Sequence, residues 1–108
     1  MNSESPVACN LEAFSEQESQ RYEQLFAQIK KSMLMLEESE NGYRLHLPYT
    51  PKAWMDVAKW ITLENMCCPF FRFAQQFVTE DKVIILHISG PEGTKAILKE
   101  ELRKGGCC

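Results

Sequence analysis

Hydrophobic residues in the first third of the chain recur every three or four positions. This spacing places them along one face of an α-helix. Ser15 stands just before the stretch and Glu18 follows three residues later, which is the residue pairing of an N-terminal capping box. The pattern predicts a helix over about residues 16–32, and its core-facing stripe consists of Tyr22, Leu25, Phe26, Ile29 and Met33.

The hydrophobic period shortens to two in the next segment, as in a β-strand with one buried face. Alternating residues flank Asn41-Gly42, a dipeptide favoured in two-residue hairpin turns. This predicts antiparallel strands at about 34–39 and 43–48. A second hairpin is predicted around Glu80-Asp81-Lys82, with alternating apolar residues at Phe71, Phe73, Phe77, Ile84, Leu86 and Ile88.

Prolines and glycines delimit two further helices. Thr50-Pro51 matches the capping residue and first position of a helix, and Pro69 cannot continue one, so we expect a helix over about 51–67. A last helix over about 91–104 is expected between the Gly-Pro and Gly-Gly sequences that bound it.

The predicted order of elements is helix, hairpin, helix, hairpin, helix. The natural solution is a two-layer α+β fold, α-ββ-α-ββ-α, in which about three helices cover a four-stranded antiparallel sheet. Residues 1–14 are expected to form an irregular arm, 15–104 a single domain, and 105–108 a flexible Gly-Gly-Cys-Cys tail.

Composition narrows the classes of partner. The net charge is −3 and Lys and Arg form no cluster, so a nucleic-acid partner is not expected. The longest apolar runs are far too short to span a bilayer, so no membrane partner is expected either. A homodimer is compatible with the sequence.

Cysteine usage indicates thiol chemistry. The N-terminus lacks the basic and apolar regions of a signal peptide, so we expect a cytoplasmic protein in a reducing compartment. The five cysteines are odd in number and unevenly spaced. They are therefore expected to be free thiols, metal ligands or redox groups rather than a disulfide scaffold.

A carboxyl group and two thiols converge at the end of the second predicted helix. Cys67 and Cys68 lie three and four residues after Glu64, which places all three on neighbouring parts of the helix surface. Glu64 also borders the apolar stripe, so we expect at least partial burial, a raised pKa and a role as proton donor. A disulfide between the adjacent cysteines would be strained.

The chemistry of this cluster favours metal capture. The negative end of the helix dipole disfavours thiolates, whereas a soft cation forces its thiol ligands to deprotonate. Two or three thiolates suit Hg(II), Cu(I) or As(III). Zn(II) is a rival, with Cys9, Cys67 and Cys68 as three ligands, although the usual CxxC spacing of zinc sites is absent.

Other candidate residues carry weaker signals. Cys107 and Cys108 follow two glycines, so they form either a mobile metal-collecting arm or a functionless tail. Cys9 alone is as compatible with a structural role as with a ligand. His46 and His87 alternate with the core-facing residues of their strands, so both should face outward as solvated side chains.

Three short motifs resemble those of a family of small, mostly uncharacterised bacterial proteins. They are Ala8-Cys9-Asn10-Leu11, then Glu64-x-x-Cys67-Cys68-Pro69-Phe70-Phe71-x-Phe73, then Ile88-x-Gly90-Pro91. The similarity covers nearly the whole chain, with Asn10 in place of the family's usual Thr. The family is associated with regulators of the mercury-resistance type, so the resemblance implies a link to heavy metals.

The C-terminal cysteines depart from that family. The terminal Cys107-Cys108 is not general among its members and is similar instead to the C-terminal cysteine pair of mercuric reductases. A chemical likeness also exists to organomercurial lyases, which cleave carbon–mercury bonds with two cysteines and an acidic proton donor. No sequence match to the lyases accompanies it, so it is an analogy of group types alone.

The sequence therefore predicts a cytoplasmic protein of metal resistance or detoxification that binds a soft metal ion or organometal. Hg(II) is favoured over As(III), Cu(I) and Zn(II), and enzymatic cleavage is left open. The predicted ligands are Cys9, Cys67, Cys68, Cys107 and Cys108, with Glu64 as the proton donor. The alternative is a thiol redox protein, or a small interaction domain with structural cysteines.

Overall fold

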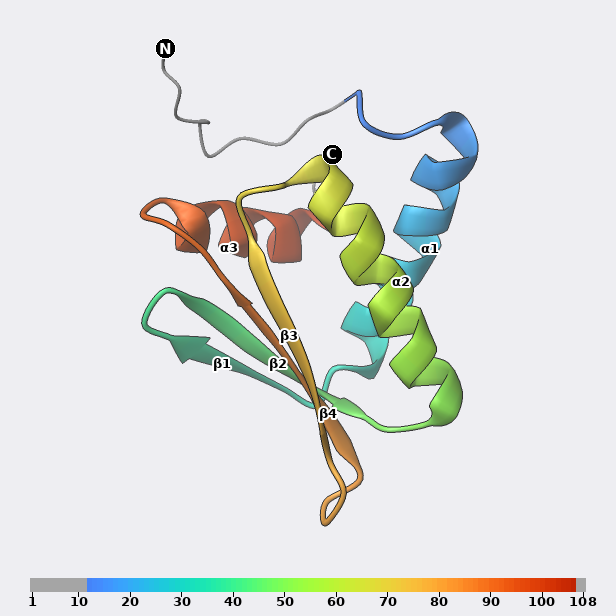
Figure 1. Cartoon of the computed structure of the whole chain (residues 1–108), viewed down its shortest axis with the longest axis vertical. Helices are drawn as coiled ribbons and strands as arrows, with labels where there is room; N and C mark the ends of the chain where they lie inside the picture. Colours follow the sequence, from blue (N-terminus) through green and yellow to red (C-terminus); the bar gives the residue numbers. More distant parts are fainter. Residues whose placement is uncertain (1–11, 107–108) are drawn as a thin grey trace.

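The element order predicted from the sequence is confirmed in the computed structural model, which describes residues 12–106. Three helices and a four-stranded antiparallel sheet form an α+β fold (Figure 1). The elements are α1 (Glu16–Ser32), β1 (Met35–Ser39), β2 (Gly42–Pro48), α2 (Pro51–Cys67), β3 (Arg72–Val78), β4 (Val83–Ser89) and α3 (Thr94–Lys104).

The helix ends follow their local sequence signals. The Ser15 hydroxyl accepts from the Glu18 amide and the Glu18 carboxylate accepts from the Ser15 amide, so the predicted capping box is formed. The α3 helix begins at Thr94, three residues later than predicted. Gly93 adopts a left-handed φ of 96° and the Thr94 amide donates to the carbonyl of Pro91, so these residues form a turn rather than helix.

The two hairpins join through their second strands. The strand order is β1-β2-β4-β3, and every neighbouring pair is antiparallel. Leu45 pairs with Leu86 and Leu47 with Ile84, so the central strands present aligned apolar residues to one face. His46 and His87 occupy the alternate positions and lie on the opposite face, as predicted.

A row of contacting aromatic rings runs from the helices to the apolar face of the sheet. The ring centroids of Tyr22 and Phe26 lie 6.0 Å apart, those of Phe26 and Trp60 5.5 Å, and those of Trp60 and Phe73 6.1 Å. Such contacts bury large apolar areas and fix how α1 and α2 pack. They also bring Tyr22 of α1 beside the C-terminal half of α2, which lies next to the end of α3 (Figure 1).

None of the helices between residues 12 and 106 combines the length and the apolar character needed to cross a bilayer.

Candidate metal centre

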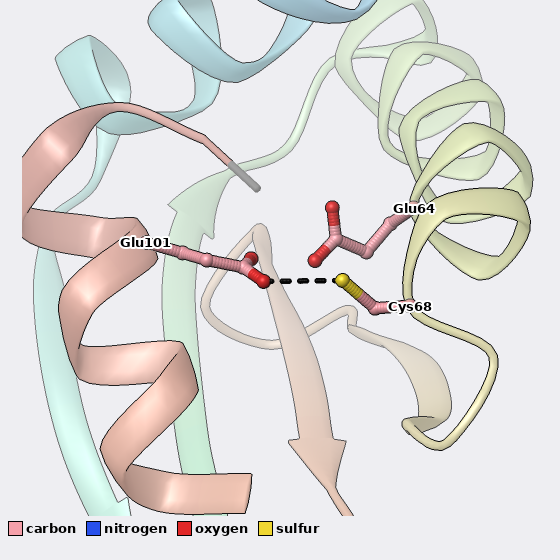
Figure 2. A group of neighbouring side chains, drawn as sticks. All are labelled: Glu64, Cys68 and Glu101. Atoms are coloured by element: carbon pink, nitrogen blue, oxygen red, sulfur yellow. Dashed lines mark hydrogen bonds between the residues drawn. The ribbon is translucent and has the colours of Figure 1, made fainter. Parts of the chain in front are cut away.

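Three buried acidic side chains from two helices meet at one point of the core. Glu64 lies on α2, Cys68 directly follows α2, and Glu101 lies on α3. Their relative exposures are 0%, 0% and 2%, and one potential ligand atom from each lies within 4.8 Å of the other two. Figure 2 shows the three side chains pointing toward one another across the gap between the helices.

Local structure accounts for the Glu64–Cys68 juxtaposition. Pro69 ends α2, and the Cys68 amide still donates to the Glu64 carbonyl at 2.6 Å. The two side chains are therefore one helical turn apart and lie on the same side of the helix. The predicted proximity of Glu64 to the cysteine pair is found.

Glu101 reaches the centre because it belongs to the buried stripe of α3. Thr94, Leu98 and Glu101 are the buried residues of this helix and repeat at helical spacing. At the helix end, the amides of Gly105 and Gly106 both donate to the Glu101 carbonyl, at 2.8 and 3.0 Å. The chain therefore folds back over Glu101 directly after the last turn.

Two hydrogen bonds from distant segments orient the acidic groups. The Tyr22 hydroxyl donates to Glu64 Oε1 at 2.6 Å, and the Cys68 thiol donates to Glu101 Oε2 at 3.2 Å (Figure 2). Within the described part of the chain, Glu64 Oε2 is fully buried and accepts no hydrogen bond.

Burial and a second carboxyl group determine the protonation state of Glu64. Removal from water, and next the adjacent Glu101 carboxyl group, raise the pKa of Glu64 to about 10, whereas Tyr22 and Cys68 act in the opposite direction. Glu64 is therefore a neutral carboxylic acid at pH 7. The predicted burial and raised pKa are found, and the burial is complete.

The two central cysteines differ in state. Both are fully buried. Cys68 is not in a disulfide, whereas Cys67 is disulfide-bonded rather than the free thiol or metal ligand expected for it, so the strained bond between the adjacent cysteines is not formed. Cys9, Cys107 and Cys108 lie outside the described residues, and so does the predicted approach of Cys9 to the central pair.

Two residues of the centre were not predicted from the sequence. The hydrophobic pattern predicts Tyr22 in the core, where it lies, but its hydroxyl also donates a hydrogen bond to Glu64. Glu101 sits in a helix rich in Lys and Glu, where a single inward-facing carboxyl group has no local signature. The only available signal was its spacing of three from the buried Leu98.

The donor set is one sulfur and two carboxylate groups. Bond lengths of about 2.0–2.3 Å place neighbouring ligand atoms of a tetrahedral zinc-like ion roughly 3.5 Å apart. Cys68 Sγ and Glu101 Oε2 already meet this spacing at 3.2 Å. With all three atoms within 4.8 Å of one another, a contraction of the order of 1 Å closes the set around one ion.

No protein-family model, curated protein or solved structure matches this chain.

Proposed function

We propose that this protein is a cytoplasmic binder of a soft metal ion, with Hg(II) favoured, and that Cys68, Glu64 and Glu101 hold the ion. One observation carries the proposal: a thiol and two carboxyl groups converge within 4.8 Å in a place closed to water. Facing carboxyl groups in a core are costly unless a proton or a cation lies between them. A cation is also the one ligand that all three side chains can share.

The thiol gives the centre its preference for soft ions. Thiolate sulfur selects Hg(II), Cu(I) and As(III) over hard cations such as Mg(II) and Ca(II). The two carboxylates alone would not make this selection, and together with one thiolate they also suit Zn(II). Hg(II) is favoured because Cys67, once reduced, offers a second thiol from the next residue in the chain.

Metal binding at this centre should release protons. Glu64 carries a proton at pH 7 and the Cys68 thiol carries another. A divalent ion that binds both groups displaces about two protons, and the charge of the buried centre is unchanged. The low-dielectric core then gains a metal ion without gaining net charge, which reduces the cost of burying the ion.

Cleavage of organomercurials is a narrower form of the same proposal. An organomercurial bound through Cys68 would lie beside the protonated Glu64 carboxyl group. Transfer of that proton to carbon breaks the carbon–mercury bond, releases the hydrocarbon and leaves Hg(II) on the thiolate and the new carboxylate. Release of hydrocarbon from a simple organomercurial, measured by gas chromatography, tests this step separately from binding.

The test of binding uses two neighbouring glutamates. The reduced wild-type protein, Cys68→Ser and Glu101→Gln are titrated with Hg(II), Zn(II), Cu(I) and As(III) against a competing chelator. Glu100→Gln is the matched control, because Glu100 is exposed and pairs with Arg103. We expect Cys68→Ser and Glu101→Gln to lose metal affinity by more than the roughly 10- to 100-fold typical of changing a residue that only hydrogen-bonds to a metal ligand. Wild-type affinity in both would refute the site.

A thiol redox function is the second candidate, and the state of the cysteines favours it. A Cys68 thiol beside a disulfide-bonded Cys67 presents both partners of thiol–disulfide exchange. Against it, Cys68 lies at a helix C-terminus beside carboxyl groups, which disfavours the thiolate that exchange requires. This function would be favoured if the metal-free protein reduced disulfides, if Glu101→Gln kept this activity, and if Cys68→Ser lost it.

The remaining predicted ligands, Cys9, Cys107 and Cys108, enter the proposal as accessory groups. The terminal pair follows Gly106, whose amide donates to the Glu101 carbonyl, so the chain leaves the described fold beside the centre. A tethered thiol pair that starts there would have a high effective concentration at Cys68. Its part as a delivery arm stays a prediction.

A further inference from the structure

A cavity lies against the outer side of the centre. Its volume is about 630 Å³, and its walls come from the start of α1 and the end of α3. Small-molecule sites in proteins are usually about 300–1,000 Å³. The cavity is therefore large enough for an organic ligand and far larger than a bare metal ion requires.

Two residues that line this cavity contact the acidic residues of the centre directly. Tyr22 lines the cavity, and its hydroxyl donates to Glu64 at 2.6 Å. Gly106 lines it as well, and its amide donates to the Glu101 carbonyl at 3.0 Å. The cavity and the centre therefore share a wall made of one aromatic ring and a glycine backbone.

The backbone in this wall depends on glycine. Gly106 has a φ of 150°, and a Cβ atom there would lie 2.9 Å from Tyr22 Cε2. Contacts this short do not occur, so a side chain at this position would displace the ring. The absence of a Cβ atom lets the chain end pack closely against Tyr22 and keeps the wall thin.

Two residues of the cavity walls carry opposite charges that a ligand can bind. Glu23 and Lys104 both line the cavity and are exposed. No salt bridge between residues of the described part of the chain involves either side chain. The rings of Phe14 and Tyr22, 5.2 Å apart between centroids, supply an apolar surface beside them. An acid, a base and an aromatic surface suit a small zwitterion with an apolar or polarisable part.

We propose that this cavity holds the carrier of the metal, a small zwitterionic thiol, so that the ion reaches Cys68 as a thiolate complex rather than as a free ion. The inference rests on the proposed metal-binding function. It follows from burial, because a centre with exposures of 0–2% does not meet a hydrated ion in solution. The carrier's ammonium group binds Glu23, its carboxylate binds Lys104, and its sulfur faces the ring of Tyr22.

Transfer from such a carrier is a ligand exchange without redox change. A bond forms between the metal and Cys68 Sγ, and the bond between the metal and one carrier sulfur breaks. The thiol proton of Cys68 leaves on the released carrier thiol, so atoms and charge balance. The transfer takes place at Tyr22, because this residue both lines the cavity and donates to Glu64.

The experiment compares two carriers that differ only in their charged groups. Reduced protein receives Hg(II) as the bis-thiolate complex of L-cysteine or of uncharged 2-mercaptoethanol, and the mercury retained after rapid desalting is measured over time. Glu23→Gln and Lys104→Gln should each slow transfer from the cysteine complex by roughly 2- to 5-fold, as expected for an exposed ion pair. Both variants should leave transfer from the mercaptoethanol complex unchanged.

Matched controls change the same charges away from the cavity. Lys99→Gln and Glu16→Gln should transfer mercury from both carriers at the wild-type rate. Equal slowing with both carriers in Glu23→Gln and Lys104→Gln, or no slowing with either, overturns the carrier site while leaving metal binding intact. A wild-type protein that retains mercury from neither carrier refutes the proposed function itself, and this inference with it.

Discussion

The glutamates of this protein fall into two regions with opposite electrostatics. On the surface, the Glu37 carboxylate contacts His46 and Arg44, that of Glu38 contacts Lys95, and that of Glu100 contacts Arg103. Hydrogen bonds from His46, Lys95 and Arg103, respectively, are the main cause that lowers the pKa of each of the three carboxyl groups. In the core, burial and a neighbouring carboxyl group raise the pKa of Glu64.

The difference shows what the buried region lacks. Each surface carboxylate is neutralised by a cation of the protein, at little gain in stability because water and salt screen the pair. Glu64 forms no salt bridge within residues 12–106 and faces a second carboxyl group and a thiol instead. A proton therefore neutralises it in the metal-free protein, and a bound metal ion would replace that proton.

The largest expected effect is on the pH dependence of stability. The pKa of Glu64 is about 10 in the folded protein and close to the ordinary glutamate value of 4.5 when unfolded, so the folded state holds the extra proton. Stability is then fully present below about pH 4.5 and is lost as the pH rises through the folded pKa. Between pH 5 and 9 the unfolding free energy should fall by up to about 1.4 kcal/mol per pH unit.

Urea unfolding of metal-free protein at several pH values measures this slope. Glu64→Gln should flatten it, because the amide keeps the shape of the side chain without a titratable proton. Glu100→Gln, which alters a surface carboxylate, should keep the wild-type slope. A Glu64→Gln protein whose stability falls with pH as steeply as the wild type would show that Glu64 is ionised in the fold.

The second effect is the number of protons released by metal. Calorimetric titration of reduced protein with a soft divalent ion, repeated in buffers of different ionisation enthalpy, gives this number directly. At pH 7 we expect about one proton fewer from Glu64→Gln than from the wild type, because the amide has no proton to release. Release of the same number by both proteins would place the ion away from Glu64.

How well the sequence predicts these two regions depends on how far apart along the chain the contacting residues are. The helices, hairpins and sheet were predicted because period, caps and turns are local properties, and the one shifted boundary lies at the Gly93 turn. Glu64 and Cys68 were placed together because they are one helical turn apart.

The contacts that complete the centre are long-range and had no such basis. Glu101 contacts Cys68 across 33 residues, and Tyr22 contacts Glu64 across 42. Both depend on how α1 and α3 dock against the end of α2, which spacing along one helix does not determine. The sequence therefore indicated the thiol and one acid of the centre, and the packing of the helices supplied the second acid and the hydroxyl donor.

A smaller effect concerns the hydroxyl group that connects α1 to the centre. Tyr22→Phe leaves the ring stack with Phe26 and Trp60 in place but removes the donor to Glu64 Oε1. Leaving a buried acceptor unsatisfied costs about 1–3 kcal/mol, so we expect a loss of stability in this range at pH 7. Because the hydrogen bond from Tyr22 lowers the pKa of Glu64, the variant should also hold the Glu64 proton more firmly.

The smallest effect should come from the surface pairs, and it completes the comparison. Glu37→Gln removes contacts with Arg44 and His46 on the open face of the sheet. Both partners keep their access to water, so the unfolding midpoint at moderate salt should stay within experimental error of the wild type. The same substitution at Glu101 should change both stability and metal affinity, because its carboxyl group shares a closed space with Glu64 and Cys68. If Glu37→Gln destabilised the protein as much as Tyr22→Phe, burial would not be what separates the two groups of glutamates.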